Sequence, residues 1–197
     1  MNFDVSRTFT LENDRVLLRP LEKGDIDHLL PFSIYEPELW TYSLISGAGE
    51  ENFRDYMDVA FEKKNIGDSY PFIVFDKNVQ RYAGSTRFYD IQPYHKTLQL
   101  GYTWYGKDFQ GTGLNKHCKY LLLEFAFEVI NVERVEFRAD ANNARSIAAM
   151  KSIGCTPEGI LRNNCTAPEG RRSSIVLSIL KEEWFLGAKQ QLKNKLI

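Results

Sequence analysis

Hydrophobic positions along the chain follow two periods. Apolar residues recur at helical spacing in the stretches 50–64, 115–130 and 144–153. Alternating or continuous apolar runs, which indicate strands, cover 15–21, 70–75, 81–89, 97–105, 132–139, 156–162 and 173–180. A short helix is expected from Asp25, its N-cap, and another over 181–191. The resulting order, β-α-α-β-β-β-α-β-α-β-β, predicts an α/β domain of the α+β type with one mixed sheet, and not a doubly wound one.

Several segments carry more specific expectations. The stretch 31–49, which starts with a proline, and the polar stretch 163–172 are expected to be loops. Alternation over 97–105 predicts one face with Leu98, Leu100, Tyr102 and Trp104, and the other with Thr97, Gln99, Gly101 and Thr103. We expect residues 1–14 to form a loosely docked arm, 15–190 a single domain and 191–197 a basic tail.

Composition excludes several classes of protein. A chain of 197 residues with 43% hydrophobic and 13% aromatic residues can bury a sizeable core. The formal net charge of −1 gives no global attraction to nucleic acid or to an anionic membrane. No signal-peptide pattern stands at Met1–Val5, so the three cysteines are expected to be reduced thiols in a cytoplasmic protein. The histidines and cysteines show no metal-ligand spacing, and no metal site is expected.

The loop after the strand 97–105 has the features of an anion site. It leads into the helix 115–130, whose first N–H groups have no partner inside the helix and whose dipole favours negative charge. Gly111 and Gly113 allow these N–H groups to converge, while Thr112 can add a hydroxyl and Lys116 a cation. The phosphate-binding patterns of P-loop and Rossmann proteins are both absent. A helix-start turn without any ligand remains the alternative for the glycines alone.

A wider set of motifs resembles the GNAT acetyltransferase superfamily. Gln110-x-x-Gly113-x-Asn115 is similar to its acyl-CoA pyrophosphate motif, and Asn143-Ala144-Arg145-Ser146 is similar to the segment that faces the pantetheine arm. The branch motifs, which resemble RimJ/RimL-type enzymes, are Leu18-Arg19-Pro20-Leu21, Gly159-Ile160-Leu161-Arg162 and Glu183-Trp184. The resemblance spans roughly 15–184, and the order of elements matches the GNAT acyl-CoA N-acyltransferase fold. Two positions depart from the pattern: Asn115 replaces a Gly or Ala, and Cys155 replaces a Phe.

The resemblance implies an acetyl-CoA-dependent N-acetyltransferase. Its coenzyme contacts would be Thr103, Trp104, Tyr105, Gln110, Gly111, Thr112, Gly113, Leu114, Asn115, Asn143 and Ser146. A backbone N–H near Trp104 or Tyr105 would stabilise the oxyanion, and the Ser146 hydroxyl would protonate the leaving thiolate. For Ser146, a bond from its hydroxyl to the first helical turn is an equal alternative.

The acceptor is expected to be a primary amine, of a protein N-terminus or of a small molecule. Glu38, Trp40 and Arg87 are the candidate contacts; the alternatives are a solvated carboxylate, a ring over the core edge and an exposed strand residue. No general base stands out. A homodimer is compatible with the resemblance. The rival interpretations are a non-catalytic acyl-CoA sensor and a nucleotide-binding domain.

Overall fold

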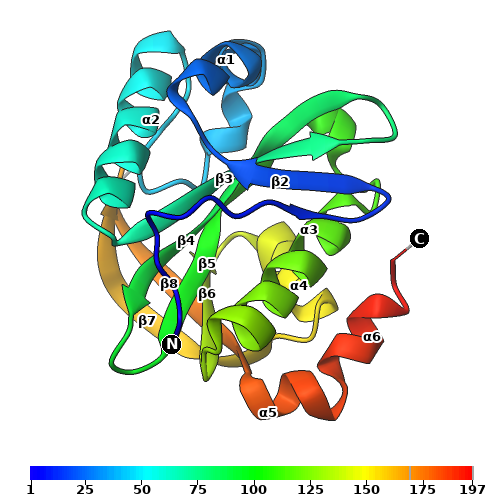
Figure 1. Cartoon of the computed structure of the whole chain (residues 1–197). Helices are drawn as coiled ribbons and strands as arrows, with labels where there is room; N and C mark the ends of the chain where they lie inside the picture. Colours follow the sequence, from blue (N-terminus) through cyan, green and yellow to red (C-terminus); the bar gives the residue numbers. More distant parts are fainter. Residues whose placement is uncertain (169, 197) are drawn as a thin grey trace.

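The structure, a computed structural model, describes residues 1–168 and 170–196. Within these ranges one eight-stranded sheet has the order β1-β2-β3-β4-β5-β6-β8-β7 (Figure 1). Its neighbours are antiparallel except for the parallel pair β5–β6, which confirms the mixed sheet. The strands are β1 (Leu11–Glu12), β2 (Val16–Pro20), β3 (Ser69–Asp76), β4 (Arg81–Gln92), β5 (Thr97–Tyr105), β6 (Arg134–Asp140), β7 (Thr156–Ala167) and β8 (Gly170–Leu180).

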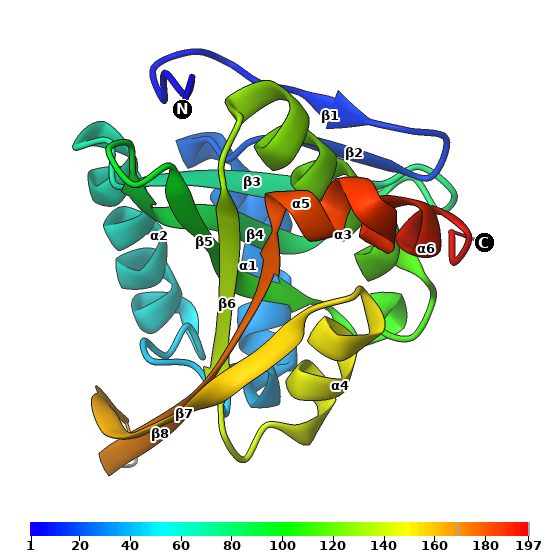
Figure 2. The same cartoon turned by 90° about the horizontal axis from the view of Figure 1, so that it is seen from below.

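Helices cover both faces of the sheet (Figures 1 and 2). The first pair, α1 (Ile26–Tyr35) and α2 (Glu50–Asn65), packs on one face, and α3 (Leu114–Glu124) packs on the other. A π-helical turn, η4 (Phe125–Ile130), extends α3. The remaining helical elements are η1 (Lys23–Asp25), η2 (Pro37–Trp40), η3 (Lys107–Phe109), α4 (Ala144–Ser152), α5 (Lys181–Glu183), η5 (Trp184–Ala188) and α6 (Lys189–Lys193).

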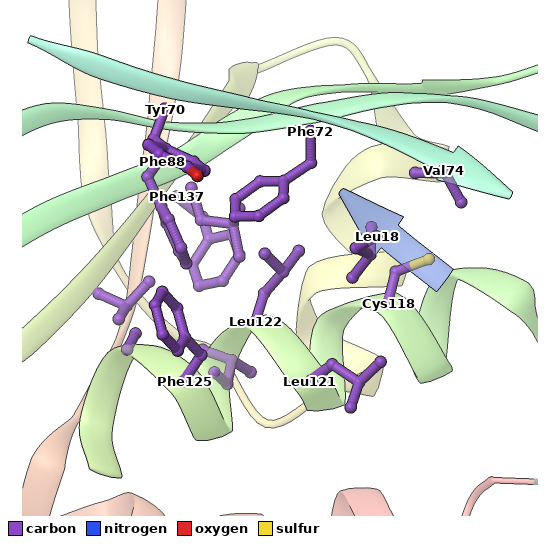
Figure 3. Packing of buried hydrophobic residues seen from close by; sticks show 14 of the residues in the cluster. Leu18, Tyr70, Phe72, Val74, Phe88, Cys118, Leu121, Leu122, Phe125 and Phe137 are labelled. Atoms are coloured by element: carbon purple, nitrogen blue, oxygen red, sulfur yellow. The ribbon is translucent and has the colours of Figure 1, made fainter. Parts of the chain in front are cut away.

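The core between α3 and the sheet follows from the helical spacing of apolar residues. Leu122 of α3 and Phe125 at the start of η4 point toward the strands, where they meet Phe72, Phe88 and Phe137 (Figure 3). All five side chains are buried. Burying each such side chain contributes roughly 1.5–3 kcal/mol, so this face holds α3 firmly against the sheet.

Helix α1 continues past Pro31, where the sequence predicts a loop. The helix runs to Tyr35 with the proline inside it. Proline normally ends a helix because it lacks an N–H. Here Phe32 packs edge-on against Trp104, and the buried Ser33 hydroxyl donates to the carbonyls of Gly47 and Gly49. These tertiary contacts outweigh the lost backbone bond, so the prediction of a loop from Pro31 is wrong for 31–35.

The prediction of a loop over 163–172 is also wrong, because most of this stretch belongs to a long hairpin. Strands β7 and β8 stay paired as far as Ala167 and Gly170. A register shift between Leu161 and Cys165 absorbs extra residues, with Asn163 at φ 50°. Such a bulge bends a ribbon without ending it. Glu169 lies outside the described residues.

Strand β5 contains a bulge that changes which face its side chains occupy. Tyr102 has φ 48°, and the β4–β5 register shifts between Ser85↔Trp104 and Arg87↔Gly101. The predicted alternation is therefore wrong beyond Leu100. Leu100 pairs with Phe88 on the α3 side, whereas Tyr102 and Trp104 contact rings of α2 and its neighbours on the opposite side. Thr103 is left facing α3.

The chain ends are more firmly attached than the sequence indicates. Phe3 and Phe9 pack against Tyr70 and Phe125, and β1 pairs with β2, so residues 1–14 are not loosely docked. At the other end, α6 includes the first three residues of the predicted tail, 191–197, and Ile197 lies outside the described residues.

Candidate functional site

The loop between β5 and α3 presents free backbone donors at a helix start. Gly111 and Gly113 have φ 75° and 87°, a region that only glycine enters without strain. Gly113 is the N-cap of α3. Within the described residues, the N–H groups of Gly111, Thr112 and Gly113 have no hydrogen-bond partner. Together with the dipole of α3 they form a site suited to a phosphate group.

Gln110 connects this loop to the strand before it and to the helix α4. Its amide nitrogen donates to the Tyr105 carbonyl at 2.8 Å, and its amide oxygen accepts from Arg145 Nη1 at 2.5 Å. The two sequence motifs, one on each side, are therefore in direct contact. Arg145 also places a positive charge beside the loop, a role that the sequence analysis missed although the residue stands inside the second motif.

Asn115 points away from the loop. Its side-chain oxygen accepts from the Tyr105 hydroxyl at 3.2 Å. Burial raises the pKa of Tyr105 well above its usual value, so this hydroxyl stays protonated and donates. The half-buried Asn115 side chain is thus held by Tyr105.

Beyond Gln99, β5 leaves one edge without a ladder partner. The parallel ladder with β6 pairs Thr97–Gln99 with Arg134–Glu136, and the described residues add no further pair. The Gly106 N–H donates to the Ala83 carbonyl on β4. Because N–H groups alternate along a strand, the Tyr105 N–H must point to the β6 side and the Trp104 N–H to β4. Of the two expected oxyanion donors, Tyr105 has the suitable direction.

The turn before α4 positions two predicted coenzyme contacts. The Asn143 side chain caps the helix by accepting from the Ser146 N–H at 3.0 Å. The half-buried Ser146 hydroxyl makes no hydrogen bond in the described part of the chain. It therefore does not bond to the first helical turn, and it remains available to a ligand.

Lys119 is a buried cation that the sequence analysis did not select. Its Nζ donates to Thr103 Oγ1 at 2.7 Å and lies 3.4 Å from Thr86 Oγ1. Burial lowers the pKa of this amine from 10.5 to about 8. The signal was present: Lys119 stands three residues before Leu122, in the apolar stripe of α3.

The buried cysteines are unsuited to covalent catalysis. Burial raises the pKa of Cys118 and of Cys155 to about 12, which keeps both thiols protonated near neutral pH. Cys155 is therefore a packing substitution for the usual Phe.

The predicted acceptor contacts lie on the face covered by α1 and α2. Trp40 is buried against Tyr56 and Trp104, so its ring forms part of the core. Glu38 is exposed and pairs with Lys107, whose hydrogen bond lowers the pKa of the carboxyl. Arg87 is 2% exposed and is therefore not the surface residue of the alternative interpretation.

Two of the cavities formed by the described residues bear on the acceptor site. One of about 310 Å³ is bounded by the segment 41–43, by Asp140 and Asn142 after β6, and by the hairpin tip at Arg171 and Arg172. This cavity brings together parts of the two stretches predicted to be loops, 31–49 and 163–172. A second, of about 410 Å³ beside His28 and Tyr82, lies away from the glycine loop.

None of the described helices has the length and apolar character that a membrane crossing requires. Residues 1–168 and 170–196 hold no group of three or more His, Cys, Asp or Glu side chains placed to bind a metal ion.

Comparisons with known proteins agree with this geometry. A family model described as an acetyltransferase (GNAT) domain matches residues 15–156. The candidate ribosomal N-acetyltransferase YdaF of Bacillus subtilis (strain 168) is 22% identical, over 87% of this chain and 94% of that protein. The structure of a candidate acetyltransferase from T. thermophilus is 33% identical, with a TM-score of 0.85 over 95% of this chain and 97% of that one. Mycobacterium smegmatis RimJ, solved with CoA-disulfide, shares the fold at 16% identity, with a TM-score of 0.79 over 95% and 93%.

The family model covers most of the chain, including the glycine loop and the α4 turn. The chain therefore belongs to the GNAT family of N-acetyltransferases.

Proposed function

We propose that the chain transfers the acetyl group of acetyl-CoA to a primary amine, of a protein N-terminus or of a small molecule. The observation that carries this proposal is the combination of a phosphate-suited loop with the free edge of β5 immediately before it. Gln110 holds the two together through the Tyr105 carbonyl.

The residues present fit a CoA thioester. The unpartnered N–H groups of the loop 111–113 would hold the pyrophosphate, with Leu114 and Asn115 adding backbone donors. Thr103–Tyr105 and Asn143–Ser146 would line the two sides of the pantetheine arm. When bound, acetyl-CoA supplies an activated thioester.

Two groups of the chain would act on the reaction. The Tyr105 N–H would donate to the thioester carbonyl as negative charge develops there, a contribution of about 3 kcal/mol to the barrier. The Ser146 hydroxyl would give a proton to the departing sulfur. Positioning the amine against the carbonyl would supply most of the rest, on the order of 7–11 kcal/mol.

The relatives support the RimJ/RimL-type branch. YdaF is named as a candidate ribosomal N-acetyltransferase, and RimJ carries CoA-disulfide on the same fold. The three cysteines are free, which is compatible with a cytoplasmic location.

Calorimetric titration with CoA and a thiol-release assay test this function. We expect saturable CoA binding and release of thiol from acetyl-CoA with at least one class in a panel of N-terminal peptides, amino acids, polyamines and aminoglycosides. CoA binding without turnover on any amine would contradict catalysis, and binding of ATP or NAD in place of CoA would contradict the coenzyme.

A pair of variants at Gly113 locates the coenzyme. Alanine at φ 87° adds backbone strain with little bulk, so Gly113→Ala is expected to weaken CoA binding moderately. Gly113→Trp adds bulk over the donors and is expected to abolish binding while circular dichroism still shows the fold. Unchanged CoA affinity in a folded Gly113→Trp protein would remove the loop from the site.

A further inference from the structure

Arg87 is a buried cation without an anion. The side chain leaves β4 on the α2 side of the sheet and is 2% exposed. Its Nε and Nη2 are buried without a hydrogen-bond partner. Among the described residues the guanidinium forms neither a hydrogen bond nor an ion pair. A buried, unpaired charge is among the most unfavourable features that a fold can contain, so this one calls for a functional explanation.

Two tyrosine rings are the partners that Arg87 does have. The guanidinium carbon lies 4.2 Å from the ring centre of Tyr102 and 4.9 Å from that of Tyr56. Stacking on aromatic rings holds the plane of the group in place but satisfies none of its N–H bonds. Nε and Nη2 form one edge of the guanidinium. Their parallel N–H bonds match the two oxygens of a carboxylate.

The surroundings of Arg87 add further buried polar groups without hydrogen-bond partners. Trp40 contacts Tyr56 and Trp104 at 5.0 and 5.1 Å between ring centres, and the indole nitrogens of both tryptophans are buried without partners. The Tyr56 hydroxyl is also buried without a hydrogen-bond partner. An indole N–H can only donate, so this aromatic cluster is suited to a ligand with acceptor oxygens.

The cluster adjoins the predicted site of acetyl transfer. Arg87 pairs with Gly101 across the β4–β5 ladder, directly before the bulge at Tyr102. The Tyr105 N–H, the predicted oxyanion donor, follows three residues after Tyr102 on the same strand. Arg87 thus stands four residues along β5 from the predicted oxyanion donor, about 13 Å of strand, on the face that α2 covers.

We propose that the acceptor is a small molecule carrying both a primary amine and a carboxylate, and that Arg87 binds the carboxylate through its Nε–Nη2 edge. This inference rests on the proposed acetyl transfer and names its substrate class. In the reaction the amine nitrogen forms a bond to the acetyl carbon, the carbon–sulfur bond breaks, and the proton lost by the amine ends on the CoA thiol. Tyr102 is the half-buried ring that stacks over the face of the guanidinium, and the Nε–Nη2 edge lies in the plane of that group.

Amino acids and their primary amides provide a test in which only the charge differs. In the thiol-release assay, wild-type protein is expected to show a kcat/KM at least tenfold higher for acids than for the matching amides. The amide has the less basic and more readily deprotonated amine, so amine reactivity does not produce this preference. Arg87→Met is expected to remove the preference, and Arg87→Lys, which keeps the charge without the edge, to reduce it.

Arg54→Met is the matched control, because Arg54 is exposed on α2 and pairs with Glu50. It should retain the preference. Binding is measured separately from turnover by following tryptophan fluorescence during titration of CoA-saturated protein with an amino acid or its amide. Wild-type protein should respond to the acid, and Arg87→Met should not.

The outcomes separate this inference from the proposed function. Thiol release that favours amides, polyamines or carboxylate-free peptides, unchanged by Arg87→Met, would overturn the inference and leave acetyl transfer intact. Absence of CoA binding would overturn the proposed function itself. If Arg87→Met fails to fold, the acid-to-amide ratios of the wild type and of Arg87→Lys decide the matter.

Discussion

Lys119 couples the stability of the protein to pH through a single buried amine. Its pKa falls from 10.5 to about 8 because burial removes water from the charged form. Below pH 8 the amine is charged in both the folded and the unfolded state, and the fold bears the cost of that charge. Between about pH 8 and 10.5 the unfolded state holds more protons, so stability rises with pH.

Lys119→Met should remove this pH dependence. Methionine fills a similar volume without a charge, so the variant is expected to be more stable than the wild type near pH 7. The difference should shrink by up to about 3 kcal/mol on going from pH 8 to 10.5. Denaturant unfolding of both proteins between pH 8 and 10.5 measures this difference in the free energy of unfolding. The cysteines titrate in the opposite sense, since their raised pKa values reduce stability above pH 9, and the charge of Lys119 lowers both of these pKa values. The part of the range between pH 8 and 9 therefore reports on Lys119 most directly. Parallel profiles for the two proteins would show that folding does not lower the pKa of Lys119.

At the scale of elements, the close contact between β4 and β5 depends on Gly84. This residue has φ 155°, and a Cβ built on it would lie 2.1 Å from the Trp104 carbonyl oxygen. The clash involves backbone, which cannot move aside as a flexible side chain can. The same contact sets the position of Trp104 and Tyr105, where the predicted oxyanion donor lies.

Gly84→Ala should therefore damage both stability and activity. We expect a loss of about 2–4 kcal/mol in the free energy of unfolding, combining overpacking with backbone strain. In the fraction that remains folded, kcat should fall because the Tyr105 N–H is displaced. Gly24→Ala is the control, since a Cβ there meets nothing within 4 Å. If Gly84→Ala keeps the stability and kcat of the wild type, then β4 and β5 can move apart at this contact without affecting the fold or the reaction.

The elements also show what could be read from the sequence and what could not. Helix α3 and the order of strands were predictable because their apolar spacing is local and regular. The extension of α1 through Pro31 was not, because Ser33 gains its partners from Gly47 and Gly49, which are far along the chain. The bulge at Tyr102 was hidden for a similar reason: a tyrosine with positive φ has no composition signal. The glycine loop and the α4 turn were recognised from motifs, whereas the unpaired state of Arg87 required the structure.

For the whole molecule, the N-terminal arm closes the core from the side of α3. Phe9 packs on Tyr70 and Phe125, and the Tyr70 hydroxyl links the arm by accepting from the Phe9 N–H and donating to the Arg7 carbonyl. These contacts are made with β3 and with η4 behind α3, whereas the glycine loop lies at the N-terminal end of α3. The arm should therefore support the fold without taking part in the site.

Phe9→Ala tests this separation of stability from binding. The ring is only half-buried, so its loss is expected to cost about 2 kcal/mol, less than the roughly 3–5 kcal/mol of a fully buried aromatic truncation. The dissociation constant of CoA, measured at a temperature where the variant is folded, should match that of the wild type. CoA at about 100 times that constant should then restore roughly 2.7 kcal/mol to either protein, because a ligand that binds only the folded state stabilises it by mass action. A dissociation constant of CoA that is tenfold larger in Phe9→Ala would instead mean that the arm holds α3 in its binding position, and that the two ends of this helix are coupled.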